Sequence, residues 1–331
     1  MVTETGDRTG PALFDRRLVF VVGKGGVGKT SVTAALGLAA LERGKRVLLV
    51  ELESENRLLP LLGLSPAADA GPSEIRPGLF RLGVGGRAAL EEYLSLVIPV
   101  RRVLRAIFDS RIYQYFVAAA PGLKELMTIG KIWYEVDRHR WDFVIVDCPA
   151  TGHSLQYLRM PKAAAETFPA GLVHREAKRV WELLRDPRQT AVIVVTIAEE
   201  MPVNETLELC QQLESELDLP REWLVVNRFH FPGLARDEVA GLERPKDLAP
   251  EEAALVDEVL ARAEEEASWA ELNEMHRRTL AEARPGWKLL VLPFLFREEF
   301  GIADLEALGA RIADAVDPRV LASARAPRAP R

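Results

Sequence analysis

The sequence predicts an α/β protein in which helices cover both faces of a doubly wound, mostly parallel sheet, with a helical subdomain inserted into it. Short β-branched runs recur along the chain, and several are apolar at every position, as expected of strands buried on both faces. Longer segments with apolar residues at helical spacing separate these runs. Because strands and helices alternate and no internal repeat is found, one copy of a parallel fold is expected.

The expected elements follow one another in a simple order. Strands are predicted at residues 18–22, 46–50, 79–84, 143–146, 191–196, 223–226 and 289–292. Helices are predicted at residues 30–43, 87–109, 123–139 and 204–217. The Glu-, Ala- and Leu-rich stretch between about residues 232 and 286 is expected to form one or two long, solvated helices before the last strand.

The domain organisation is expected to be simple. Residues 16–316 are predicted to form one domain, with a helical insertion at about residues 87–139. Residues 1–15 are mostly polar and contain Gly10 and Pro11, and the tail alternates Ala, Arg and Pro, so 1–15 and 317–331 are predicted to be disordered.

Composition narrows the function classes. With 48% hydrophobic and 28% charged residues, the 331-residue chain is typical of a globular protein. The net charge of −6 argues against nucleic acid as the main partner. No stretch reaches the roughly 18 apolar residues of a membrane-spanning helix. The two cysteines, Cys148 and Cys210, exclude a disulfide framework, and a cytoplasmic location is expected.

A glycine-rich loop carries the strongest motif. Residues 23–30 read GKGGVGKT and match the G-x-x-x-x-G-K-[ST] pattern between a predicted strand and a predicted helix. Glycines let backbone N–H groups approach phosphate oxygens, and the helix adds the positive end of its dipole. Lys29 is expected to reach the β- and γ-phosphates, and the Thr30 hydroxyl to bind Mg²⁺. The predicted ATP-binding residues of this loop are Gly23, Lys24, Gly25, Gly26, Val27, Gly28, Lys29, Thr30 and Ser31.

Lys24 is the second lysine of the loop. It is either a solvated surface residue or a charge that reaches the phosphates of a partner subunit, since it comes too early in the loop to fold back easily onto its own nucleotide. Spacing alone leaves both interpretations open.

The loop also resembles the deviant Walker A motif, with its signature lysine, of a dimeric P-loop class. Further along, residues 147–155 read DCPATGHSL and resemble the switch II signature of one branch of that class. The likeness continues through residues 197–202, 225–228 and 292–294. The chain is thereby similar to the arsenite-pump and tail-anchored-protein targeting ATPase family.

This resemblance implies a Mg²⁺-dependent ATPase and a set of site residues. It implies a homodimer or paired heterodimer in which Lys24 acts on the partner's nucleotide, and a role for Asp147 in holding Mg²⁺ through water. The Gly152 N–H would sense the γ-phosphate. The resemblance also implies that Asn227 and Pro293 contact the adenine base. Glu199 either reaches the nucleotide at the dimer interface or is a plain surface carboxylate, and the two interpretations stand equal.

The chain departs from the family in the switch I segment. The family reads STDPA there, and its aspartate positions the attacking water; residues 51–55 read ELESE, which puts Glu53 at the aspartate position. A glutamate supplies the same carboxylate on a longer stem. Because a shift of about 1 Å can cost on the order of a hundredfold in rate, slow hydrolysis supported by Glu53, together with Lys24 and Lys29, is predicted. Glu51 and Glu55 are interpreted as neighbours without a role.

Two further family features have no counterpart. The arsenite pump uses a cysteine triad, which two cysteines cannot supply. The targeting factor joins its dimer through zinc held by C-x-x-C pairs, and no such pair occurs here. No zinc is therefore expected, and any dimer must depend on apolar burial and on the nucleotide.

The helical region at residues 87–137 raises the question of a client. Its apolar residues, with Tyr113, Tyr115 and Phe116 after them, either line a groove for a hydrophobic protein or membrane partner or pack on the sheet. The leading hypothesis is a nucleotide-gated dimeric switch. A metabolic enzyme that uses ATP, and a slow or non-hydrolysing subunit of a heterodimer, are the alternatives.

Overall fold

The computed structural model describes residues 12–53, 56–66, 71–97, 110, 122–231, 233–242 and 249–316, and all structural statements below concern these residues. The predicted disordered tail, residues 317–331, and most of the residues before 13 lie outside this set. So do the predicted client residues Tyr113, Tyr115 and Phe116.

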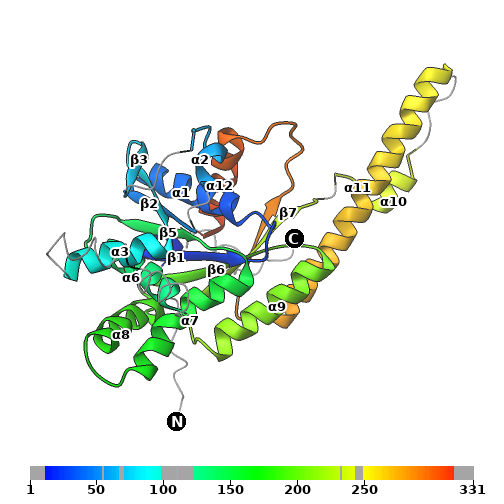
Figure 1. Ribbon diagram of the computed structural model, residues 1–331. Helices are drawn as coiled ribbons and strands as arrows, with labels where there is room; N and C mark the ends of the chain where they lie inside the picture. The colour runs from blue at the N-terminus through cyan, green and yellow to red at the C-terminus, as the bar shows by residue number, and fades with distance from the viewer. Residues whose placement is uncertain are drawn as a thin grey trace, which may run out of the picture.

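An eight-stranded sheet forms the centre of the molecule, in the order β3-β4-β2-β5-β1-β6-β7-β8 (Figure 1). All neighbouring strands are parallel except β3 and β4. The predicted α/β class with a mostly parallel sheet is therefore confirmed. The strands are β1 (Leu18–Gly23), β2 (Val47–Leu52), β3 (Ser73–Arg76), β4 (Leu79–Val84), β5 (Phe143–Asp147), β6 (Thr190–Ile197), β7 (Arg221–Phe229) and β8 (Lys288–Pro293).

Helices lie on both sides of the sheet (Figure 1). Along β1, Leu18, Phe20 and Val22 belong to one apolar core, and Val19 and Val21 belong to the other, as the two-residue period of a strand requires. The helices are α1 (Lys29–Glu42), α2 (Leu58–Leu61), α3 (Gly86–Val97), α6 (Leu123–Asp137), α7 (Thr151–Thr167), α8 (Leu172–Arg185), α9 (Glu200–Ser215), α10 (Arg236–Ala240), α11 (Pro250–Ala283) and α12 (Ile302–Val316). Helices α1 and α12 cover one face, and α6 to α9 cover the other.

Helix α11 projects from the body of the molecule with α10 beside it (Figure 1). Its 34 residues span about 51 Å at 1.5 Å per residue. Pro250 opens the helix, and the Glu252 carboxylate accepts a hydrogen bond from the Ala249 N–H at 2.9 Å, which satisfies a donor of its first turn. None of the described helices combines the length and the apolar character needed to span a membrane.

Two segments differ from the prediction. Residues 13–15 were expected to be disordered, but they form a short 3-10 helix in which Leu13 and Phe14 are buried, so apolar burial outweighs the polar character of the preceding stretch. Strand β3 was not predicted. Three of its four residues are polar and it pairs antiparallel at the edge of the sheet, so it lacks the apolar run that marks the buried strands.

Candidate nucleotide-binding site

The glycine-rich loop connects β1 to α1 and depends on glycine at two positions. Gly23 has φ +149°, and a Cβ there would lie 2.2 Å from the Val195 carbonyl oxygen. Gly28 has φ +91°, and a Cβ there would lie 2.3 Å from the Asn227 amide nitrogen. A larger residue would have to displace the strand backbone at Val195 in the first case and the Asn227 side chain in the second, and both positive φ values favour glycine.

The first turn of α1 points its N–H groups into this loop. No side chain caps the helix at Gly28, so the donors of its first turn and the positive end of its dipole are available to an anion. The Lys29 side chain is 8% exposed, and its ammonium group donates to the Lys24 carbonyl oxygen at 2.8 Å. Ser31 is half-buried in the same turn.

Asp147 lies beside this turn because β5 is the neighbour of β1 in the sheet. The Thr30 hydroxyl donates to Asp147 Oδ2 at 2.7 Å. Asp147 is 8% exposed, and its other oxygen, Oδ1, is buried without a hydrogen-bond partner among the described residues. Burial raises the pKa of Asp147 to about 6, against the opposing effects of Thr30 and Lys29. The unpaired Asp147 oxygen and the neighbouring Thr30 hydroxyl are oxygen ligands of the kind that a hard divalent cation prefers.

Lys24 is held by its own chain. Its ammonium group forms an ion pair with Glu205 of α9 at 2.6 Å, and both side chains are about one third exposed. The side chain thus lies at the surface of the loop, away from the buried Lys29.

Glu53 adopts an unusual backbone conformation directly after β2. Its φ of +70° is in the left-handed region, which is costly for a residue other than glycine. Its carboxylate lies 3.4 Å from the Tyr157 hydroxyl and 3.5 Å from His153 Nδ1, both in α7. Burial and the nearby Glu53 raise the pKa of the Tyr157 phenol. Glu53 is therefore brought to the start of α7, where Gly152 is exposed as the second residue of the helix.

The three remaining predicted residues lie at the ends of neighbouring strands. Asn227, near the end of β7, is 5% exposed and donates to the Val27 carbonyl oxygen at 3.0 Å, so it packs directly against the loop. Glu199 precedes α9 and lines a hollow of about 230 Å³ together with Arg228 and His230. Pro293 ends β8 opposite Phe229.

Sequence reasoning missed one buried group near this site. Glu51 was interpreted as a neighbour without a role, yet it is 3% exposed and forms an ion pair with the fully buried Arg81 at 2.6 Å. The available signal was the pair of opposite charges inside two strand segments that are otherwise apolar.

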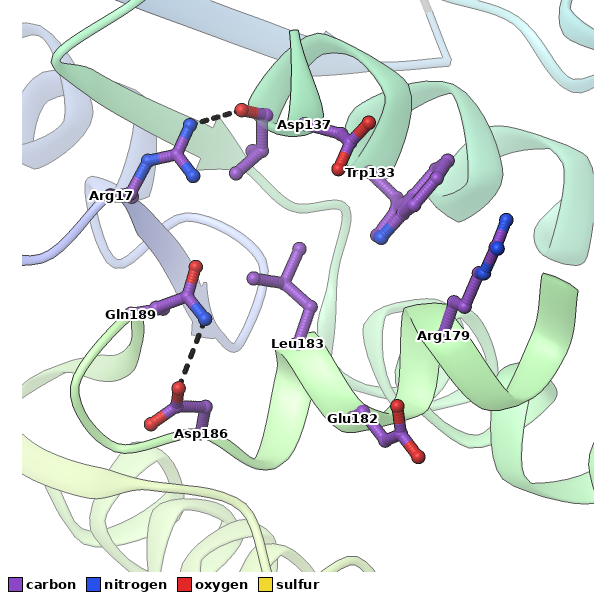
Figure 2. A pocket seen from close by; sticks show the side chains of 9 residues that line it. Arg17, Trp133, Asp137, Arg179, Glu182, Leu183, Asp186 and Gln189 are labelled. Carbon is purple, nitrogen blue, oxygen red and sulfur yellow. Dashed lines mark hydrogen bonds between the residues drawn. The ribbon is translucent and has the colours of Figure 1, made fainter. Parts of the chain in front are cut away.

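A larger hollow of about 510 Å³ lies at the opposite edge of the sheet (Figure 2). It includes Arg17, which precedes β1, and residues of α6 and α8, but none of the predicted site residues. Some of its polar groups are already paired, because Arg17 donates to the Val136 carbonyl and Gln189 donates to Asp186. We assign it no role in nucleotide binding.

Neither zinc nor a soft-metal site was expected from the sequence. Among the described residues, no group of three or more histidine, cysteine, aspartate or glutamate side chains is gathered as a metal site. Cys148 and Cys210 are both buried as free thiols, and burial raises the pKa of each. Neither thiol is therefore disposed to ionise and bind a soft metal.

Comparison with known proteins identifies relatives of this site. The family model described as anion-transporting ATPase matches residues 16–172 and 172–261. The ATPase BagA of Mycobacterium tuberculosis is 33% identical over 222 residues, which cover 64% of this chain and 65% of that protein. An arsenical pump-driving ATPase of Acidiphilium multivorum is 27% identical over 231 residues, which cover 63% of this chain and 39% of that protein. The family resemblance predicted from the motifs is confirmed, although the chain spans slightly less than two thirds of its mycobacterial relative.

Proposed function

The chain belongs to the anion-transporting ATPase family, and we propose that it is an ATPase that binds ATP with Mg²⁺ and uses slow hydrolysis to switch a dimer between closed and open forms. The observation that carries this proposal is the Thr30–Asp147 hydrogen bond beside Lys29, at the end of a loop that requires glycine at residues 23 and 28.

Each residue of the loop has a proposed role. The N–H groups of residues 23–31, including Ser31, bind the phosphates, and Lys29 neutralises them. Thr30 would hold Mg²⁺, and Asp147 would hold it through water; the Asp147 Oδ1, which has no hydrogen-bond partner among the described residues, fits this role. The bound cation supplies positive charge against the phosphate oxygens.

A second group of residues completes the proposed site. Glu53 orients the attacking water, and the Gly152 N–H detects the γ-phosphate. Asn227 and Pro293 contact the adenine, and Glu199 reaches the nucleotide where two subunits meet. The Asn227 amide has a second N–H besides the one given to Val27, which leaves it a donor for the base.

The dimer is proposed on the position of Lys24. Its side chain lies at the loop surface and is bound to Glu205 rather than to the buried floor of its own loop. An exposed pair of this kind contributes at most about 1 kcal/mol, so exchange to the phosphates of a partner subunit carries little cost. A homodimer or a paired heterodimer both satisfy this proposal, and the cytoplasm, a reducing compartment with ATP, suits its free thiols.

The proposed client is a hydrophobic segment of a protein or membrane protein. An apolar groove of about 520 Å³ runs between α3, α6 and α8, and its lining includes Leu90, Leu126, Met127, Phe168, Val173 and Val180. Phe168 and Val173 are more than 40% exposed, so part of the groove lining is open to a partner. This groove supports recognition of an apolar helix, and nucleic acid is not proposed as a partner.

Phosphate release from ATP tests the proposed activity. The purified chain is expected to release phosphate slowly and only with Mg²⁺, and Lys29→Ala is expected to abolish the release. Glu53→Gln is expected to lower kcat by about a hundredfold or more while ATP still binds, because it removes the group that orients water. ATP binding without any single-turnover hydrolysis would instead favour the non-hydrolysing subunit.

Arsenite is not expected to stimulate this ATPase. The two buried thiols cannot form the three-thiolate site that a soft metalloid requires. The measurement is phosphate release with and without arsenite, and a rise with arsenite that is lost in Cys148→Ala or Cys210→Ala would contradict the expectation.

A further inference from the structure

Glu51 connects three parts of the structure around the segment that carries Glu53. Its Oε2 accepts from Arg81 Nε at 2.6 Å, which ties it to β4. Its Oε1 accepts from the backbone N–H groups of Arg57 and Leu58, at 2.6 and 3.0 Å, where α2 begins. One carboxylate thus satisfies the first donors of α2 and pairs with a guanidinium inside the sheet.

These contacts lie on both sides of Glu53. Glu51, two residues before Glu53, is fixed in β2 by its pairing with β5. Its carboxylate also accepts hydrogen bonds from residues 57 and 58, which follow Glu53 in the chain. The Glu53 N–H donates to the Val84 carbonyl oxygen at 3.0 Å. Glu53 and Asn56 both have positive φ, at +70° and +50°. Non-glycine residues keep such conformations only where the surroundings hold them, and the buried Glu51 carboxylate contacts the chain on the far side of both residues.

We propose that Glu51, supported by Arg81, is a positioning residue that sets the place of the Glu53 carboxylate in the hydrolysis step. This inference rests on the proposed function, since it assigns Glu51 an effect on catalysis through Glu53. Glu51 itself is given no direct contact with a nucleotide, because both of its oxygens already accept hydrogen bonds from Arg81, Arg57 and Leu58. Its loss would let the Glu53 segment move by an ångström or so, which is enough to cost on the order of a hundredfold in rate.

Glu51 has a second way to affect hydrolysis, which does not involve Glu53. Glu51 lies opposite Asp147 in the pairing of β2 with β5, so it could act on the proposed Mg²⁺ site instead. The two routes differ in what they change. An effect through Glu53 lowers kcat at constant Mg²⁺ requirement, whereas an effect through Asp147 shifts the Mg²⁺ concentration that gives half of the maximal rate.

The test uses the variant Glu51→Leu/Arg81→Met, which removes the carboxylate together with its guanidinium partner. Replacing a buried ion pair by apolar residues of similar volume is often neutral, but the Arg57 and Leu58 N–H groups lose their acceptor, so this variant is expected to fold with lower stability. Its Kd for ATP and its Mg²⁺ requirement are expected to stay within about twofold of wild type, while kcat falls about 10- to 100-fold. Glu51→Gln keeps an acceptor for Arg57 and Leu58, so it is expected to retain an intermediate kcat.

A double-mutant cycle with Glu53 identifies the route. If Glu51 acts through Glu53, adding Glu51→Leu/Arg81→Met to Glu53→Gln lowers kcat little further. The matched control is Glu135→Gln in α6, a carboxylate 1% exposed that accepts from the buried Trp141 indole at 3.0 Å and lies at the opposite edge of the sheet from the loop. It is expected to lower thermal stability and leave kcat unchanged.

Several results would overturn the inference. These are an unchanged kcat in the folded Glu51→Leu/Arg81→Met variant, a shifted Mg²⁺ requirement, or full additivity with Glu53→Gln. Should the double variant not fold, Glu51→Gln is judged by the same three criteria. A wild-type chain that does not hydrolyse ATP refutes the proposed function itself, which separates that failure from this one.

Discussion

The environment of Asp147 disfavours the charge that the proposed Mg²⁺ site requires. Its carboxylate is buried, one oxygen is bound by Thr30, and the other has no partner in the part of the chain that the structure describes. Burial therefore disfavours its charged form, which is the cause of its raised pKa. A group whose charge costs folding energy is expected where that charge serves a ligand.

Asp147→Asn should separate these two effects. The amide has the same shape, can still accept from Thr30 and carries no charge, so the melting temperature without Mg²⁺ is expected to be equal to or higher than that of wild type. Phosphate release at a fixed Mg²⁺ concentration is expected to fall about 10- to 100-fold. Calorimetric melting and a release assay measure both, and a lower melting temperature with full activity would show that the carboxylate is only structural.

At the scale of single residues, the sequence predicts the motif residues better than the residues that hold them in place. The loop and Thr30 were predicted because their spacing follows directly from the chemistry of phosphate binding, and Asp147 was predicted from the family resemblance of residues 147–155. Glu51 was not, because its partner Arg81 is 30 residues away and meets it only when β2 pairs with β4. The hydrogen bond from Asn227 to Val27 likewise joins residues 200 positions apart, which meet only when the sheet has formed.

At the scale of elements, α11 is tied to the strand ends that surround the site. Asn273, 3% exposed near the middle of the helix, donates to the Ala198 carbonyl at 3.3 Å and accepts from the His230 N–H at 2.9 Å. Ala198 precedes Glu199, and His230 follows the end of β7. Helix α11 is therefore attached next to Glu199 and next to the end of β7, which carries Asn227, and both of these residues are proposed to contact the nucleotide.

Asn273→Ala is expected to destabilise the protein. It leaves two buried backbone groups unpaired, at about 1–3 kcal/mol each, so the free energy of unfolding in urea should fall by that order. Ser268→Ala, one turn away on the same helix, is the matched control. Its hydroxyl bonds only within the helix, at 2.8 Å to Glu264, so its effect should stay within about 0.5 kcal/mol. Equal effects of the two variants would mean that Asn273 does not anchor α11.

The sequence predicted the buried strands well and the edges of the fold poorly. A strand such as β5 is apolar throughout, so its pattern alone identifies it. The edge strand β3 and the helices α8 and α12 were not separately predicted. Polar edge residues carry no periodic apolar signal. Helix α8, by contrast, has apolar residues such as Ala177, Val180 and Leu184 at helical spacing, so its signal was present in the sequence and was not used.

At the scale of the whole molecule, the proposed switch needs two subunits. The loop, Asp147, Asn227 and Pro293 all lie at or near the carboxyl edge of the sheet, where ligands bind in parallel α/β folds. Lys24 is at the surface of that edge and pairs there with Glu205. A dimer that meets along this edge would bring each Lys24 to the partner's nucleotide.

Mixing two inactive variants tests whether Lys24 acts across the dimer. Lys24→Ala and Glu53→Gln are each expected to hydrolyse ATP poorly. In a mixed dimer, the Lys24→Ala subunit keeps its own Glu53 and receives Lys24 from its partner, so one site becomes complete. Phosphate release is therefore expected to rise on mixing. No gain, with mixed dimers demonstrated by native mass spectrometry, would contradict action in trans.

The most direct test of the account is titration calorimetry of the purified chain with ATP in the presence of Mg²⁺. We predict saturable binding of one nucleotide per chain, lost in Lys29→Ala and weakened when Mg²⁺ is withheld, because the loop and the Thr30–Asp147 pair form one charged cradle. If the folded wild-type chain takes up neither ATP nor ADP, the proposed nucleotide site does not exist.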